Sequence, residues 1–353
     1  MSRPQNLRKP FISFGNPFRM ISPKGLSLPP KLVALLDSFE ETLTEKLKTL
    51  KPRDGDGVLS LSWMTSALEA LCAIHTEVKS LIAALELPVS DWDGKWIDVY
   101  LDNSVKLLDV CIAFSSEVSR LNQGNLFLQC VLHNLDSTSA VQFTKAQSSL
   151  DGWRQHVSSK NLRIEKCFTI LGQLIDTLDL PRIKNSSKGR VLMRAMYGVR
   201  MVTVFICNVF AVAFSSSSQK LVDLPAPEAC LWAEAFTEVQ VLVNGDIQKI
   251  HSSGKVTGVK ELEAVDTIVK RLHTLVQQGE DIVEVEALRS SIKDLGKSSG
   301  ELTQGLDFLA RGIDGFFQIV LTGRDALLGK LRVGNDVSNT MQQHNHVKRQ
   351  VVR

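Results

Sequence analysis

MVTVFICNVFAVAF, residues Met201 to Phe214, is the longest nearly unbroken apolar run in the chain, and its location decides the fold. A transmembrane helix needs roughly 20 predominantly apolar residues, whereas a run of about 10 to 14 is more typical of a buried core helix. Extending the run brings in Arg194 and Arg200, and an arginine near the centre of a membrane costs about 2.5 to 3.5 kcal/mol on insertion scales. The run therefore predicts either a buried bundle helix or a membrane-embedded segment.

The segment just before this run, KNSSKGRVLMRAMYGVR from Lys184 to Arg200, carries five positive charges and no acid. Basic clusters beside apolar stretches attract anionic lipid headgroups by about 1 kcal/mol per charge. A solvated basic helix face, or pairing with acidic helices elsewhere, explains the same pattern. We expect a membrane or partner contact here, through Lys184, Lys188, Arg190, Arg194, Arg200, Met201, Val204, Phe205, Phe210 and Phe214.

Composition favours a protein with a large core. Of the 353 residues, 44% are apolar and 22% are charged, so global disorder is not expected. The net charge of +3 is too small to indicate a nucleic-acid partner. The cysteines occur singly and mostly inside apolar helical patterns, which is typical of reduced core thiols in an intracellular protein.

The two ends of the chain differ from its middle. Residues 1–30 contain six prolines, several basic residues and no acid, and they read as a basic proline-rich segment. A plastid transit peptide, a membrane-surface segment and a disordered leader are all compatible with it; a secretory signal peptide is not. Residues 333–353 form a polar tail that we expect to be disordered. One helical domain, residues 31–332, lies between them and contains the apolar segment 201–214.

Apolar residues in this domain recur at spacings of three and four, which predicts an all-α fold, an elongated antiparallel bundle of long helices. The second helix, from about Ser60 to Glu86, has a coiled-coil-like seam. NQGN at residues 122–125 indicates a kink or break in the third helix, and residues 158–161 indicate another break. The last helix, about residues 284–331, has a heptad pattern from Val285 to Leu327.

Three side chains in the helical domain are candidates for recognition. Trp92 and Trp96, four residues apart, share a helix face and form a candidate partner contact, although anchoring of a helix entry against the core is the more common role of such a pair. His75 falls on an apolar stripe, where a histidine is usually a hydrogen-bonded core residue.

Sequence patterns typical of catalysis are missing. The chain has no glycine-rich phosphate loop after a strand, and no HExxH or GxSxG pattern. We therefore expect a non-enzymatic protein with no cofactor and no metal site.

Several longer blocks resemble the plant BYPASS family, in order along nearly the whole chain. They are FGNPFR, LELPVSDWDGKWIDVYLDNSVKLLDVC, RLNQGN, KAQSSLDGW, KNSSKGRVLMRAMYGVR and GRDALL. The resemblance implies a regulator needed for normal root and shoot development, which prevents overproduction of a mobile root-derived signal that arrests shoot growth. It also implies secretory-pathway components as partners, and it carries over no catalytic residues.

Three functions follow as expectations. The first is a non-enzymatic regulator that docks on a membrane or a protein partner, which places the protein inside the plant cell as a peripheral or single-pass membrane-associated protein. The second is a secretory-pathway scaffold. The third is an enzyme or small-molecule binder that acts on the signal precursor through an interhelical pocket with His75 or the tryptophan pair.

Overall fold

The computed structural model describes residues 28–52, 57–86, 94–135, 140–179, 186–215, 221–252, 258–278 and 282–351, with side chains except at 94–96, 140, 278, 282–284 and 330–351. Every regular element in these ranges is an α-helix, which confirms the all-α prediction. The helices are α1 (Pro30–Thr49), α2 (Leu61–Leu85), α3 (Gly94–Leu135), α4 (Ala140–Ser158), α5 (Leu162–Asp176), α6 (Ser187–Ser215), α7 (Ala233–Ser252), α8 (Lys260–Gln278) and α9 (Ile282–Val351).

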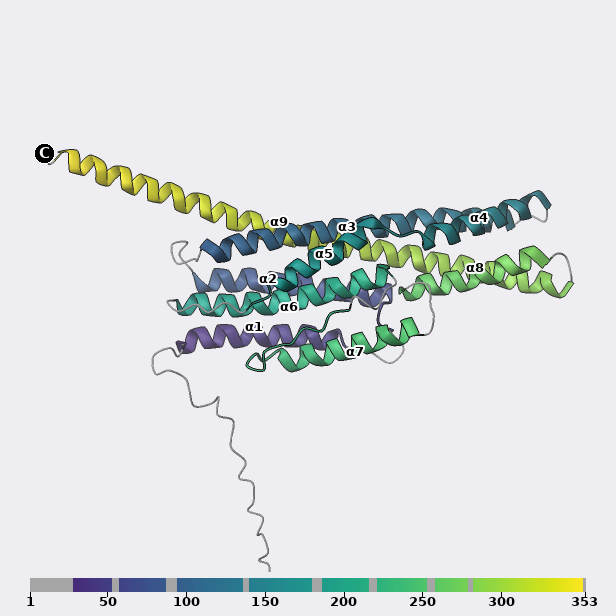
Figure 1. Ribbon diagram of the computed structural model, residues 1–353, viewed down its shortest axis with the longest axis horizontal. Coiled ribbons are helices and arrows are strands. Elements are labelled where there is room, and N and C mark those ends of the chain that lie inside the picture. Colours follow the sequence, from purple (N-terminus) through teal and green to yellow (C-terminus); the bar gives the residue numbers. More distant parts are fainter. Residues whose placement is uncertain are drawn as a thin grey trace, which may run out of the picture.

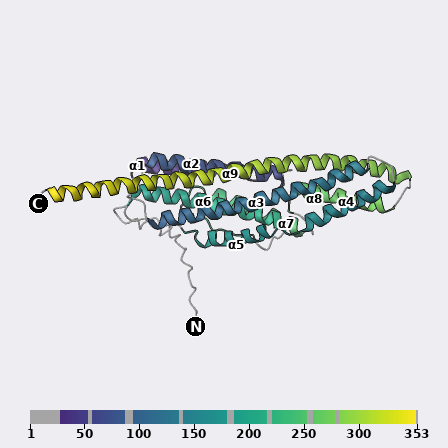
Figure 2. The same ribbon diagram turned by 90° about the horizontal axis from the view of Figure 1, so that it is seen from above.

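The bundle is long and narrow, and consecutive helices such as α3 and α4 run antiparallel (Figures 1 and 2). Helix α9 extends along the whole body and packs against α2, α3 and α8. At 1.5 Å per residue, the 42 residues of α3 span about 63 Å. One end of the body consists of α4, α8 and parts of α3 and α9, whereas α1, α2, α5, α6 and α7 gather at the other (Figure 1).

Helix starts follow local capping chemistry. The Ser60 side chain accepts a hydrogen bond from the Trp63 N–H at 3.1 Å, and the Glu261 carboxylate of α8 accepts from the Leu61 N–H at 3.0 Å. Both bonds satisfy donors that the first turn of α2 leaves without partners. The Asn161 side chain caps α5 in the same way, which confirms the predicted break after Ser158.

Two expectations about helix ends were wrong. NQGN does not interrupt α3, because the Asn125 amide donates to Thr303 of α9 and accepts from Ser299, so that its polar groups are satisfied inside a continuous helix. The polar tail 333–353 is not disordered up to Val351, since α9 continues to that residue. No proline stops α9, and extending an existing helix adds one hydrogen bond for each residue fixed.

Candidate functional site

The apolar run lies inside the bundle, in the C-terminal half of α6. Met201, Val204, Phe205 and Phe210 are buried, and Phe214 is partly buried against Phe114 with 5.7 Å between the ring centroids. Helix α6 is long and apolar enough to cross a membrane, yet 83% of its most apolar 18-residue window is covered by the protein. Helices α1, α2, α3 and α5 pack against it. The buried residues named above could touch a membrane or partner only if the bundle opened.

In the basic N-terminal half of α6, Arg194 forms hydrogen bonds with other parts of the bundle. Arg194 donates two hydrogen bonds to the buried Glu40 carboxylate, from Nε at 2.5 Å and from Nη2 at 3.0 Å, and a third to the Ala229 carbonyl. Hydrogen bonding to Glu40 raises the pKa of Arg194. Arg194 therefore pairs with an acidic residue of another helix, which was one of the alternatives for the basic segment.

The other basic residues of this segment make weaker contacts. Arg190 donates to the Ser187 hydroxyl at 3.0 Å, and Lys188 lies 3.4 Å from the Glu86 carbonyl. Arg200 donates to the carbonyl and the hydroxyl of Thr177, both neutral groups. Lys184 lies outside the described residues.

The tryptophan pair stays a prediction. Trp92 lies outside the described residues, and only the backbone of Trp96 is described, in the first turn of α3. The structure therefore places neither indole.

His75 is a core residue with a defined partner. Its Nε2 lies 3.0 Å from the Thr203 hydroxyl, which itself donates to the Val199 carbonyl, so that the histidine nitrogen is the donor. The ring also packs edge-on against Phe316 at 5.1 Å. Burial, and next the nearby Lys79, lower the pKa of His75 to about 4. The imidazole is consequently neutral at physiological pH.

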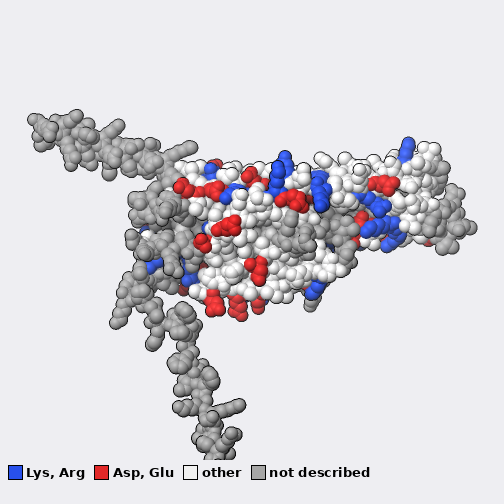
Figure 3. All heavy atoms as spheres, viewed as in Figure 1, with Lys and Arg blue, Asp and Glu red and all other residues white. Residues whose placement is uncertain are grey.

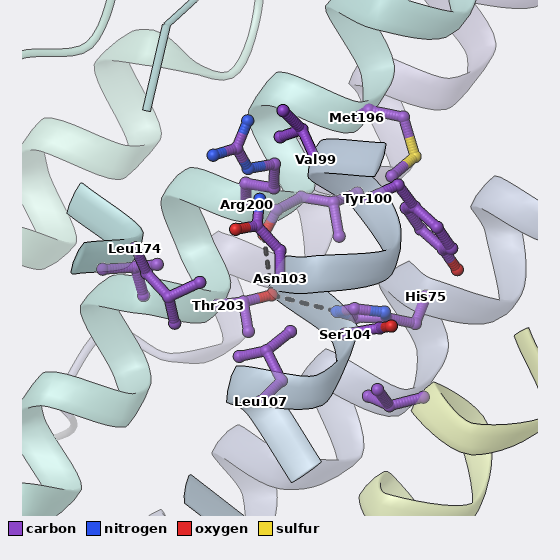
Figure 4. Close-up of a pocket in the computed structure, with 13 residues that line it drawn as sticks. His75, Val99, Tyr100, Asn103, Ser104, Leu107, Leu174, Met196, Arg200 and Thr203 are labelled. Atoms are coloured by element: carbon purple, nitrogen blue, oxygen red, sulfur yellow. Dashed lines mark hydrogen bonds between the residues drawn. The ribbon is translucent and has the colours of Figure 1, made fainter. Parts of the chain in front are cut away.

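A small cavity of about 50 Å³ lies beside His75, between α2, α3, α5, α6 and α9 (Figure 4). Its walls are mainly apolar, with a few polar groups that converge on it: Asn103, Ser104, Arg200, Thr203 and His75. A second cavity of about 160 Å³ shares His75, Tyr100, Met196 and Val199 with the first. Mostly apolar walls with a few placed polar groups are typical of small-molecule sites.

Asn103 is the residue of this cavity that sequence reasoning missed. It is only 5% exposed, and neither atom of its amide has a hydrogen-bond partner within the described part of the chain. A single asparagine in a helical sequence reads as a solvated position, so no pattern marks it. Desolvation lowers the pKa of the neighbouring Arg200.

A wider surface groove of about 720 Å³ runs along the outer face of α7. Leu231, Val241 and Leu242 line it and are between 46% and 64% exposed. Glu228, Glu234 and Glu238 also line it, and Lys51 at the end of α1 pairs with Glu238. On the face shown in Figure 3, acidic side chains gather below, over α1, and basic ones lie near α8.

Groups suited to catalysis do not converge in the parts of the chain that the structure places. No set of three or more His, Cys, Asp or Glu side chains there could hold a metal ion. All six cysteines are free, and burial raises the pKa of Cys111 and Cys167 to about 12, which keeps both thiols protonated.

The molecule is thus an all-α bundle protein whose most apolar helix is internal. It belongs to the BPS1 family, because the model of the family described as Protein BPS1 matches residues 67–313. Over 333 residues it is 50% identical to "Protein BPS1, chloroplastic" of Arabidopsis thaliana, covering 94% of this chain and 93% of that protein. This membership confirms the resemblance to the BYPASS family and supports the class of plant developmental regulators.

Two rice proteins are also similar. UPF0496 protein 4 of Oryza sativa subsp. japonica, and the protein of the same name from subsp. indica, are each 44% identical over 296 residues. These cover 83% of this chain and 65% of each rice protein. No solved structure matches the chain.

Proposed function

We propose that this protein is a non-enzymatic regulator of root and shoot development, which prevents overproduction of a mobile root-derived signal that arrests shoot growth. Membership of the BPS1 family supports the developmental role. The neutral His75 and the protonated buried thiols support a mechanism without catalysis. The protein acts by binding another protein.

The α7 groove is the observation that carries this proposal. Contiguous exposed apolar patches mark interaction sites, and Leu231, just before α7, lines one open groove together with Val241 and Leu242 of α7. The acids Glu228 and Glu234 beside them select for positive charge. The partner therefore presents an amphipathic helix with one apolar and one basic face.

Paired aspartate substitutions test the groove. Leu231→Asp with Val241→Asp puts two charges into it without touching the core, and Val105→Asp with Ile112→Asp on the exposed face of α3 is the matched control. The groove variant should lose both the captured partner and developmental rescue of plants that lack the protein, while the control keeps both. Full rescue by a correctly folded groove variant would refute the proposal.

Reversing an acidic charge in the α7 groove tests whether the partner is basic. Glu234→Lys should weaken capture of a basic partner, whereas Glu41→Lys on the exposed face of α1, outside the groove, should not. Equal effects of the two substitutions would argue against a basic partner.

Membrane association is a second candidate, favoured by the length and apolar character of α6. It requires the buried face of α6 to leave the bundle, and with it the side chains from Met201 to Phe210. Successive extraction of membranes with salt, carbonate and detergent separates this candidate from protein docking.

Location within the cell is the third part of the proposal. The Arabidopsis relative carries the word chloroplastic in its name, and residues 1–30 have the acid-free composition of a transit peptide. We place this protein in the plastid, so a fluorescent fusion of the full chain should label plastids and a fusion of residues 31–353 should not. Labelling of secretory membranes by the full chain would instead favour the secretory-pathway scaffold.

A further inference from the structure

Asn103 is the residue of the cavity beside His75 whose burial the fold itself does not explain. Both polar atoms of its amide are buried without a partner among the placed residues. Leaving a buried polar group without a hydrogen bond costs about 1 to 3 kcal/mol, so native proteins generally supply a partner. An acceptor from outside the chain, bound in the cavity, would pair with the Nδ2 donor of this amide.

The positive charge of Arg200 favours a negatively charged partner. Arg200 lines the same cavity, and its hydrogen bonds go to the neutral groups of Thr177. Asp179 acts on it through the charge interaction, which raises the pKa of Arg200 against the larger effect of desolvation. No aspartate or glutamate lines either of the two adjoining cavities, whereas Lys79 lines the second. In Figure 4 the Asn103 amide points from α3 towards the Arg200 side chain. Two such donors on one side of a cavity suit a carboxylate, which accepts several hydrogen bonds and prefers arginine.

The remaining walls suit a hydrocarbon. Leu107, Leu174, Met196 and Val204 line the first cavity, and Ile82 and Leu327 line the second. An apolar cavity of about 150 Å³ is known to hold benzene, so the second cavity, at about 160 Å³, can take a short hydrocarbon chain. His75, Tyr100, Met196 and Val199 border both cavities, so the second cavity adjoins the first at these side chains.

We propose that the paired cavities bind a small apolar monocarboxylic acid, with the carboxylate between Asn103 and Arg200 and the hydrocarbon chain along Met196 and His75. This site is separate from the α7 groove, so its failure would leave the proposed protein docking unaffected. The site binds the acid and performs no reaction on it.

Thermal unfolding of the purified full chain with hexanoate or octanoate tests the site. A carboxylate held by Asn103 and Arg200 should raise the melting temperature and give a measurable heat of binding, whereas hexanol and octanol, which lack the charge, should bind at least about tenfold more weakly. Equal shifts with acid and alcohol would mean an apolar cavity without a carboxylate site, and would overturn the proposal. The absence of any shift would mean that the cavity holds ordered water only, and would overturn it as well.

Two variants locate the site. Asn103→Leu removes the unpartnered amide while keeping the volume, so it should fold at least as stably as the natural chain and bind octanoate at least about tenfold more weakly. Arg200→Gln should have the same effect on binding, and Lys188→Gln, which makes the same charge change elsewhere on α6, should leave binding unchanged. Undiminished octanoate binding by a folded Asn103→Leu variant would contradict the assignment.

Discussion

The buried carboxylate of Glu40 on α1 and the guanidinium of Arg194 on α6 form a two-bond ion pair across 154 residues of sequence. Glu40 is completely buried, while the Arg194 side chain is 30% exposed. The same carboxylate accepts from the Leu231 N–H at 2.8 Å, and Arg194 donates to the Ala229 carbonyl. One pair therefore joins α1, α6 and the segment that leads into α7.

Replacing Glu40 should destabilise the bundle strongly. Removing one partner of a buried pair costs about 3 to 5 kcal/mol, and the partial exposure of Arg194 places Glu40→Ala near the lower value. The neighbouring Glu41→Ala, on an exposed residue, should change the free energy of unfolding by less than about 0.5 kcal/mol. Urea unfolding followed by circular dichroism measures both. Similar midpoints for the two variants would show that the pair contributes no stability.

Acid should destabilise the protein through His75. The folded state holds the pKa of His75 at about 4, below the unfolded value near 6.5, so the unfolded state binds more protons between these pH values. The contribution of the neutral His75 to the free energy of unfolding is therefore fully present above about pH 6.5. It is lost as the pH falls through 4, by about 3 kcal/mol in all.

His75→Gln isolates this effect. Glutamine keeps a donor for Thr203 but does not titrate, so the stability difference between the natural chain and the variant should shrink as the pH falls from 6.5 to 4. His251, whose pKa burial also lowers, is present in both proteins and cancels. A difference that is independent of pH would show that His75 is not the group responsible.

Gly258 should not tolerate a side chain. A Cβ atom there would lie 2.6 Å from the carbonyl oxygen of Ala213 and 2.9 Å from its Cα, both backbone atoms near the end of α6. Gly258→Ala should therefore cost about 1 to 3 kcal/mol. Gly245→Ala in α7, where nothing lies within 4 Å of the added carbon, should instead stabilise the helix by about 1 kcal/mol. Thermal unfolding of both variants distinguishes backbone crowding from a general effect of glycine, and equal shifts would exclude crowding.

The sequence was sufficient for the fold class and for most helix boundaries, because these depend on local periodicity and breakers. The start of α2 at Leu61 and the gap between α4 and α5 are examples. The partners of polar helix residues depend instead on contacts distant in sequence. Asn125 read as a break until Ser299 and Thr303 from α9 completed its hydrogen bonds.

The candidate site was less predictable for the same reason. The basic segment suggested a surface, but the acid that pairs with Arg194 comes from α1. Asn103 had no sequence signal, since its significance lies in the lack of a partner inside a cavity built by five helices. Helix α7 packs against α1 and leaves Val241 and Leu242 exposed, and no local pattern encodes which side of a helix its neighbour covers.

Burial of Met201 to Phe214 inside a protein bundle underlies both the fold and the proposed docking. The most direct measurement is fractionation of plant cells that express the tagged full chain, followed by successive washes of the membranes with high salt, carbonate and detergent. With α6 inside the bundle, we expect to recover the helical protein without detergent, in the soluble fraction or after the salt wash. Retention through carbonate, with release only by detergent, would show that α6 is embedded in a membrane and would contradict the account.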